Sequence, residues 1–193
     1  HPLVTAIPGL KVAMPSTPAD AKGLLATAIR DDDPVIFFEH KTLYTISGDV
    51  PDDEYLVPFG KARIVSEGND CTLVATGRMV SFCENAAQAL AEDGITCDII
   101  DPRTTSPLDE DAILDSVEKT GRLVVVDETP PRCSFAADIA ALAAGEVFSS
   151  LKAPVRQITG PHSPVPFAKE LEGEFVPSPT KIRDAVSEVV NFK

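Results

Sequence analysis

The chain is poor in the residues that mark most catalytic and nucleic-acid-binding proteins. Its 193 residues include only three histidines and four cysteines, and 17 lysines and arginines stand against 30 aspartates and glutamates. The formal charge of −13 argues against a nucleic-acid or anionic-membrane partner and favours a basic protein partner. No apolar run approaches the roughly 20 residues that a membrane span needs. We therefore expect neither nucleic acid nor a membrane among its partners.

Sequence motifs of nucleotide-binding proteins, hydrolases and metalloproteases are also missing. No GxGxxG follows a strand-like run, and GxxxxGK[ST], GxSxG and HExxH do not occur. The four cysteines, Cys71, Cys83, Cys97 and Cys133, show no CxxC spacing. Cys71 and Cys97 fall in predicted buried strands. This pattern favours reduced core thiols in a cytosol-like compartment over disulfides or a metal site.

Residues 71–128 have the pattern of a double βαβ unit. CTLVATG (71–77) is apolar on both faces, which is typical of a strand covered by helices, and ITCDIID (95–101) and RLVVVDE (122–128) follow as further strands. One helical pattern between them ends at Gly94, and a second opens at Pro107 and Asp109 and ends at Gly121. Because the connections are short, we expect parallel pairing with right-handed crossovers, and so an open, mostly parallel, three-layer α/β sheet.

The remaining segments extend this sheet on both sides. Further strands are predicted at residues 10–15, 34–40, 62–70 (an edge strand) and 153–160, and further helices begin at Ser16 or Thr17, at Ser134 and at Ser178. Residues 41–60, rich in Gly, Pro and Asp, are interpreted as a linker between two domains. Residues 160–179 hold five prolines, so we expect an irregular loop that lies across a surface or an interface.

Three consecutive aspartates stand at the carboxyl end of the first long predicted helix. Backbone carbonyls carry the negative end of the helix dipole there, so Asp31, Asp32 and Asp33 are disfavoured unless something offsets them. One explanation is a solvated turn in which the aspartates hydrogen-bond the local backbone before Pro34. The other is a cation held by the free carbonyls of the helix end. The residues taken alone favour the turn.

The three histidines give weak functional signals. His40 closes a predicted strand at its carboxyl end, where α/β folds place ligand sites, although a solvated or interface histidine is favoured. His1 stands at what we expect to be a frayed end, and His162 lies in the proline-rich segment. No residue is predicted to be catalytic.

Four segments together resemble the beta subunit of the thiamine-diphosphate-dependent decarboxylating component of 2-oxo acid dehydrogenase complexes. They cover residues 8–44, 60–80, 97–128 and 159–179, beginning PGLKVAMP, GKARIVSEG, CDIIDPRTT and TGPHSPVPF. The segment DETPPRCSFAADIAAL (127–142) is most similar to the acetoin dehydrogenase branch, with the pyruvate and branched-chain branches as alternatives. The C-terminal part of a deoxyxylulose-phosphate synthase or transketolase, and a non-catalytic assembly module, are further alternatives.

The resemblance implies a division of the chain and a place in a larger enzyme. Residues 1–52 resemble the tail of a pyrimidine-binding α/β domain with its linker, and residues 53–193 a transketolase-type C-terminal domain. The family forms heterotetramers of two alpha and two beta subunits that cleave acetoin or a 2-oxo acid oxidatively and pass the acyl group to lipoyl-lysine. Implied partners are thus an alpha subunit, a second beta subunit and the lipoyl acyltransferase core, in a bacterial cytoplasm or a mitochondrial matrix.

The resemblance also implies where cofactors bind. Thiamine diphosphate and magnesium belong to the complete heterotetramer, and the family's pyrimidine-binding glutamate and active-site histidine lie upstream of His1. We therefore expect no cofactor-binding residue here and an inactive isolated chain. A structural potassium held by backbone oxygens of the AIRDDDP segment maps to Ala28, Ile29, Asp31 and Asp33, which shifts the preference from the turn to the cation. Docking of the acyltransferase is expected at an acidic face comprising Glu146, Glu170, Glu172, Glu174, Asp184 and Glu188.

Overall fold

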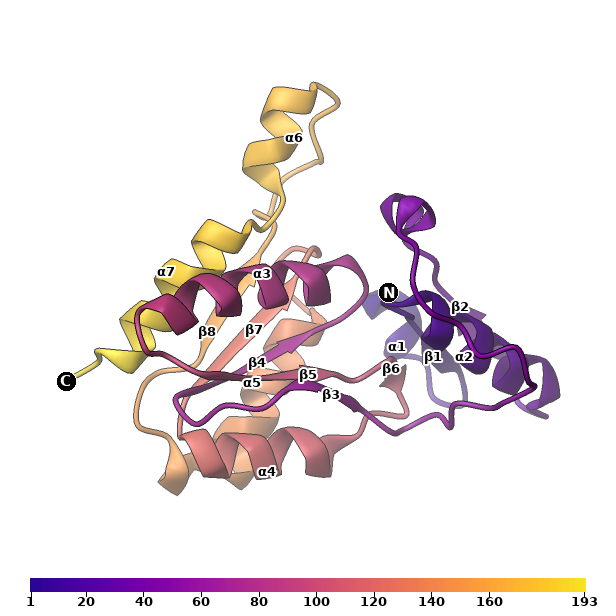
Figure 1. Ribbon diagram of the computed structural model, residues 1–193, viewed down its shortest axis with the longest axis horizontal. Helices are drawn as coiled ribbons and strands as arrows, with labels where there is room; N and C mark the ends of the chain where they lie inside the picture. Colours follow the sequence, from indigo (N-terminus) through magenta and orange to yellow (C-terminus); the bar gives the residue numbers. More distant parts are fainter.

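A five-stranded sheet forms the centre of the larger of two units. The computed structural model describes all residues, 1–193, and its main sheet has the order β3-β5-β4-β7-β8 (Figure 1). The strands are β3 (Arg63–Ser66), β4 (Cys71–Ala75), β5 (Cys97–Asp101), β7 (Leu123–Asp127) and β8 (Arg156–Thr159). The neighbouring strands β5, β4, β7 and β8 pair in parallel, and β3 pairs antiparallel with β5 at one edge. The predicted open, mostly parallel sheet with its edge strand is confirmed.

Helices cover both faces of this sheet and give the predicted three layers. Figure 1 shows α3 (Arg78–Glu92) and α7 (Pro179–Val190) on one face, and α4 (Glu110–Thr120) and α5 (Phe135–Glu146) on the other. Helix α4 ends at Gly121, whose φ of 74° only glycine adopts without strain. Ser134 and Ser178 cap α5 and α7 with their side-chain oxygens.

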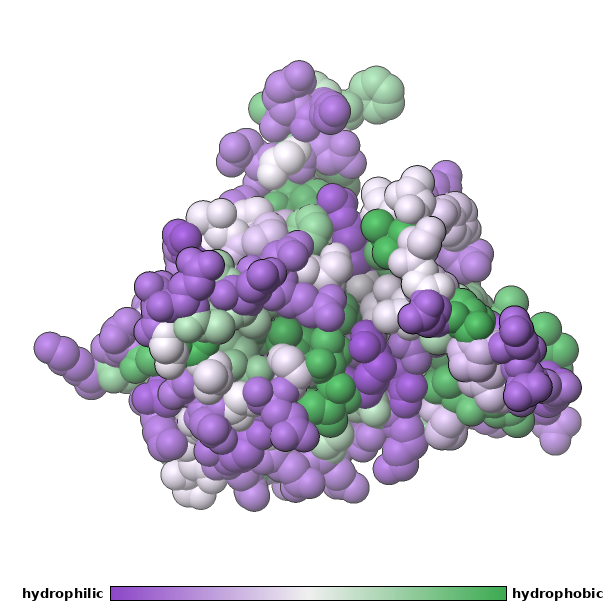
Figure 2. All heavy atoms as spheres, viewed as in Figure 1, coloured by the Kyte–Doolittle hydropathy of each residue, from purple (hydrophilic) through white to green (hydrophobic).

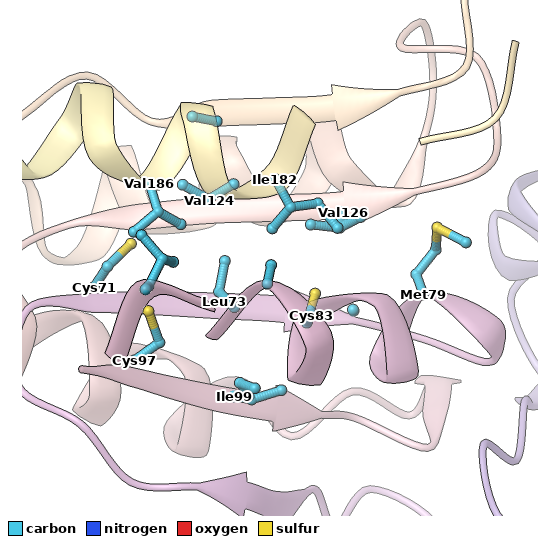
Figure 3. Close-up of a cluster of buried hydrophobic side chains, with 14 of the residues drawn as sticks. Cys71, Leu73, Met79, Cys83, Cys97, Ile99, Val124, Val126, Ile182 and Val186 are labelled. Carbon is cyan, nitrogen blue, oxygen red and sulfur yellow. The ribbon is translucent and has the colours of Figure 1, made fainter. Parts of the chain in front are cut away.

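The core on the α3 and α7 side contains three of the four cysteines. Figure 3 shows Cys71, Cys83 and Cys97 among aliphatic side chains of both helices and the sheet. All four cysteines are free, and only Cys133 is exposed. Burial raises the pKa of each of the three buried thiols, that of Cys97 to about 12, so they stay protonated at neutral pH.

A smaller unit packs beside the carboxyl ends of the main strands. It contains α1 (Pro2–Thr5), β1 (Lys11–Ala13), α2 (Pro18–Arg30), β2 (Val35–Phe37) and the 3₁₀-helix η1 (Lys41–Thr45). Its three-stranded sheet has the order β2-β1-β6, with β1 and β2 parallel and β6 (Thr104–Ser106) antiparallel to β1. Strand β6 was not predicted, and it comes from the chain segment that otherwise builds the larger unit.

The segment between the units is fastened to α2. Lys22 donates from Nζ to the carbonyls of Pro51, Asp52 and Asp53, and its ammonium lies 5.2 Å from the centre of the Tyr55 ring. Further along, the Val57 N–H donates to the carbonyl of Gly23, and the side chain of Thr27 donates to the carbonyl of Val57. Residues 51–57 of the predicted linker are therefore fastened to one unit, and its first residues, 41–45, form η1.

The prediction of an irregular loop over residues 160–179 is wrong in one part. Lys169–Phe175 form a helix, α6, which stands away from the body as an arm (Figure 1). Phe175 anchors the arm because its ring packs against Gly160, where a side chain would collide with it. Figure 2 shows hydrophobic atoms among hydrophilic ones at the tip, where Phe167 and Leu171 are exposed.

A short 3₁₀-helix, η2 (Phe148–Ser150), completes the elements. None of the helices combines the length and the apolar character that crossing a membrane requires.

Candidate functional site

A crevice opens where strands β4 and β7 end. The chain leaves β4 for β5 on one side and later reaches β7 on the other, so the direction of winding reverses between these neighbours. Helix α3 follows β4 on one face, and α5 follows β7 on the other. In open α/β sheets ligands bind at such a reversal, beside the carboxyl ends of the strands. Here the smaller unit covers this position and forms the second wall.

Two adjoining cavities, of about 200 and 650 Å³, lie between the two units, and a third, of about 230 Å³, lies beside them within the smaller unit. The third cavity shares Pro15 and His40 with the smaller of the two and Ser16 and Leu43 with the largest. The two cavities between the units share Arg78 at the start of α3. The largest is bounded by the first turn of α2, by η1, and by the guanidinium groups of Arg63 and Arg78. Helix α3 begins at Gly77 without a side-chain cap, and φ of 53° there requires glycine. The cavities together are called the cleft below.

Two histidine–carboxylate pairs join the units across the cleft. His40 Nε2 lies 2.9 Å from Glu128 Oε2, the backbone N–H of Thr42 donates to Nδ1 of His40, and the Thr42 hydroxyl lies 2.8 Å from the same nitrogen. Because Nδ1 accepts, the ring proton sits on Nε2 and points to Glu128. His40 is thus an interface histidine, which lies three residues after the end of β2 and caps η1. The sequence pattern placed it, but its partner Glu128 could not be read from spacing.

His1 departs from the expectation of a frayed end. Its side chain is 5% exposed, donates to Asp127 at 3.2 Å, and meets the Phe135 ring edge-on at 6.0 Å between centroids. Burial alone would raise the pKa of Asp127, but hydrogen bonds from His1 and Thr129 outweigh it and hold that pKa below its ordinary value. Asp127 therefore stays ionised and serves as the anchor for His1.

The aspartate segment at the end of α2 is organised around a lysine that sequence reasoning missed. Lys11 Nζ lies 2.7 and 2.8 Å from the two carboxyl oxygens of Asp31 and 3.0 Å from Asp33 Oδ2. The hydrogen bonds from Lys11 and from the backbone N–H of Asp33 lower the pKa of Asp31. The carboxylates of Asp31 and Asp33 raise the pKa of Lys11. Lys11 sits at the start of β1, 20 residues away, so only the parallel pairing of β1 and β2 brings it here.

The four residues predicted to hold potassium lie together but differ in role. Ala28 and Ile29 are in the last turn of α2, and the Ala28 carbonyl accepts from the backbone of Asp31 at 3.4 Å. The Asp31 carboxylate also accepts from the Asp33 N–H at 2.9 Å, as in the turn explanation. Since Lys11 takes both carboxylates, a cation would depend on backbone carbonyls, which are oxygen donors suited to a hard ion. The potassium site stays a prediction.

The cleft offers hydrogen-bonding groups but lacks a nucleophile beside a base. No cluster of three or more histidine, cysteine, aspartate or glutamate side chains is arranged to hold a metal ion. The buried carboxylates are each engaged by a cation, a histidine or a hydroxyl, as the network around Asp101 shows. These contacts hold the two units against each other.

Comparisons with known proteins agree with the two units. Residues 60–182 match the family described as "Transketolase, C-terminal domain", and residues 2–47 match "Transketolase, pyrimidine binding domain". The predicted boundary at residue 52 lies between these ranges and stays a prediction. A solved structure described as "Split gene transketolase, inactive beta4 tetramer" aligns over 100% of this chain and 61% of its own, with a TM-score of 0.81 and 20% identity, which shows the shared fold.

Curated relatives carry the resemblance further. The chain is 54% identical to the acetoin:2,6-dichlorophenolindophenol oxidoreductase subunit beta of Bacillus subtilis (strain 168), over 97% of this chain and 55% of the relative. The Cupriavidus necator protein of the same name is also 54% identical, over 95% and 54%. The B. subtilis 2-oxoisovalerate dehydrogenase subunit beta is 43% identical, over 96% and 57%. The chain spans about half the length of these relatives.

These matches confirm the resemblance to beta subunits and to the acetoin dehydrogenase branch. The transketolase C-terminal match covers more than half of the chain, and the fold of the larger unit agrees with it. The chain therefore belongs to the transketolase C-terminal domain family, and the curated relatives that it matches are oxidoreductase and dehydrogenase beta subunits.

Proposed function

We propose that this chain is the C-terminal part of the beta subunit of a thiamine-diphosphate-dependent acetoin dehydrogenase. In the assembled enzyme the substrate is cleaved oxidatively and its acyl group passes to lipoyl-lysine of an acyltransferase. The observation that carries this proposal is the 54% identity to two acetoin oxidoreductase beta subunits over nearly the whole chain. The 43% identity to a 2-oxoisovalerate dehydrogenase keeps 2-oxo acids as the second candidate substrate class.

The chain's own contribution, in this proposal, is assembly. It would attach to the alpha subunit and a second beta subunit and present a docking surface to the acyltransferase. Support comes from the lack of a nucleophile–base pair in the cleft and from the exposed arm with apolar and acidic side chains. Thiamine diphosphate, when bound with magnesium in the complete enzyme, supplies the electron sink for carbon–carbon cleavage. In this proposal, the residues of this chain keep its two units together beside the thiamine diphosphate site of the complete enzyme.

A chimaeric enzyme tests the substrate. This chain would replace the matching half of the B. subtilis acetoin oxidoreductase beta subunit, and the product would be combined with that enzyme's alpha subunit. We expect acetoin-dependent reduction of 2,6-dichlorophenolindophenol that exceeds reduction with pyruvate or 2-oxoisovalerate. Size-exclusion chromatography reports assembly separately. An assembled chimaera that turns over a 2-oxo acid but not acetoin would overturn the substrate assignment.

We also propose a potassium ion at the carboxyl end of α2. The backbone oxygens of Ala28, Ile29, Asp31 and Asp33 would hold it, beside the Lys11 ion pairs. The supporting observation is that this helix end gathers carbonyl oxygens and two carboxylates in one turn, with a single ammonium to balance them.

A further inference from the structure

A cluster of four charged side chains fastens α2 to the edge of the main sheet. Asp20, in the first turn of α2, lies 3.1 Å from Arg103 Nη1 and 3.3 Å from Arg63 Nε. Arg63 reaches Asp101 as well, at 3.3 Å. Ser16, just before α2, donates its hydroxyl to Asp101, and the Arg103 N–H donates to the other oxygen at 3.0 Å. The smaller unit thus contributes Ser16 and Asp20, and the larger one the remaining three residues.

Asp101 is the member of this cluster whose charge is least secure. It is fully buried at the end of β5, whereas the side chain of Arg63 is 31% exposed. Burial raises the pKa of Asp101 to about 6, although the Ser16 hydrogen bond and Arg63 act against it, and the nearby carboxylate of Asp20 adds to the rise. The other titratable group that faces it is Cys83 on α3, which stays protonated because it is buried.

We propose that this cluster is a proton-responsive latch, in which protonation of Asp101 tightens the attachment of α2 to the main sheet and loss of the proton loosens it. When α2 moves away, Asp101 regains water and its pKa returns toward the ordinary value of 3.8. A group whose pKa is higher in the closed form contributes stability that is complete below the open-form pKa. That contribution is lost as the pH rises through about 6.

The latch bears directly on the cleft. Ser16, Asp20 and Arg63 all line its largest cavity, of about 650 Å³. Movement of the first turn of α2 therefore changes the width of this cavity. The device makes access to the cleft depend on pH near 6, so that the cleft is held more tightly closed in mildly acidic solution.

Amide hydrogen exchange of the 193-residue chain tests the latch. Opening constants for α2 amides, corrected for intrinsic exchange rates, should increase roughly tenfold between pH 5 and pH 7, as linkage requires for a group that titrates near 4 when open and near 6 when closed. In Asp101→Asn, which cannot ionise, this tenfold change should be lost, and only the pH dependence contributed by His1 and His40, which join the same two units, should remain. A wild-type chain with no pH dependence in α2 would overturn the proposal.

The matched control is Asp98→Asn, which removes another buried carboxylate of β5 that faces α4 and does not touch the smaller unit. This variant should keep the tenfold change in α2. If it also abolishes the change, the latch is wrongly assigned. Carbon-13 NMR of the Asp101 carboxyl group provides an answer even if Asp101→Asn fails to fold, because a pKa of 4 or below in the native chain would contradict the latch.

Discussion

Two buried aspartates of β5 show how neighbours decide the charge of a side chain. Asp98 and Asp101 are both almost inaccessible to solvent, and burial raises the pKa of each. At Asp98, hydrogen bonds from Lys119, Ser116 and the Gly68 N–H outweigh burial and lower the pKa. Asp101 also accepts three hydrogen bonds, but it shares Arg63 with Asp20, whose nearby carboxylate adds to the rise, so burial prevails there.

The Asp98 network should therefore be an acid-sensitive element of stability. Asp98→Asn removes the charge that orders three donors, and we expect a loss of about 2 to 4 kcal/mol at pH 7, measured by urea unfolding. Because the folded pKa is lowered, this contribution is present above the ordinary pKa of 3.8 and is lost as pH falls through the folded value. The difference in unfolding free energy between the wild type and Asp98→Asn should accordingly become smaller below about pH 4.

The control for this prediction is Asp115→Asn on α4, an exposed acid of the same type. Its effect should stay within about 0.5 kcal/mol. Equal effects of the two substitutions at pH 7 would show that the buried network does not stabilise the fold.

At the scale of elements, two glycines in helices should respond oppositely to alanine. Gly145 in α5 has no atom within 4 Å of an added Cβ, so Gly145→Ala should stabilise the chain by about 0.5 to 1 kcal/mol. In α2, an added Cβ at Gly23 would lie 2.5 Å from Val57 and 2.7 Å from Tyr55. Gly23→Ala should therefore destabilise by about 1 to 3 kcal/mol. Thermal unfolding of both variants measures the signs, and a stabilised Gly23→Ala would show that residues 55–57 do not pack on α2.

The carboxyl end of α2 gives a prediction about an ion. If backbone oxygens of Ala28, Asp31 and Asp33 bind potassium, replacing it with choline at matched ionic strength should lower the melting temperature. A ligand present at one hundred times its dissociation constant stabilises by about 2.7 kcal/mol. Lys11→Met serves as the companion variant, because it frees the two carboxylates and should make the potassium dependence steeper. If the melting temperature of neither protein depends on potassium, the ion site is contradicted and residues 31–34 form an ordinary turn.

The sequence predicted helices and strands correctly where a single local pattern defines them. Ser134, Gly121 and the apolar runs of β4, β5 and β7 marked strands and helix ends correctly, because caps and periodicity are local. Strand β6 was missed since three residues between Arg103 and Pro107 carry no periodicity and form a strand only through β1. Helix α6 was missed because prolines flank only seven helical residues.

The candidate site depended on contacts that spacing does not encode. His40 could be placed at the end of a strand, but its partner Glu128 lies 88 positions away along the chain, and the Lys11 ion pairs depend on strand pairing. The latch was also invisible, since Asp20 and Asp101 become neighbours only when the two units meet. Such contacts decide pKa values and attachment, which is why the sequence alone predicted the fold better than the site.

For the molecule as a whole, the first expectation concerns the cofactor. Because the proposal assigns thiamine diphosphate and magnesium to the complete enzyme, we expect that the isolated chain does not bind thiamine diphosphate measurably. Titration calorimetry with magnesium present would reveal binding tighter than about 100 μM, roughly −5.5 kcal/mol. Such binding would contradict the division of labour proposed for the complete enzyme.

The second expectation concerns an acidic docking face. Glu170 and Glu172 on the arm are exposed and make no ion pair, whereas Glu188 and Asp184 are engaged by arginines. If the proposed acyltransferase docks here through a basic domain, its binding should weaken markedly between about 0.05 and 0.5 M salt, because screening shortens the Debye length. Charge reversal at Glu170 and Glu172 should weaken it more than reversal at two control acids.

Those control acids are Asp52 and Asp53, whose side chains are exposed and whose carbonyls hold Lys22 through the backbone, which substitution preserves. Biolayer interferometry on the two double variants compares them. Equal losses, or binding that salt does not change, would show that the arm carries only a solvated surface.

The fastening of the connecting segment limits how far the two units can part. Val57 is tied to α2, and Gly60 is already bonded to Thr104. Only three Cα steps join them, which span about 10 Å when fully extended. A tether this short keeps a detached unit at a high effective concentration beside its own partner surface. Exchange of the small unit between two copies of the chain should therefore be rare, and each opened molecule should close again on itself.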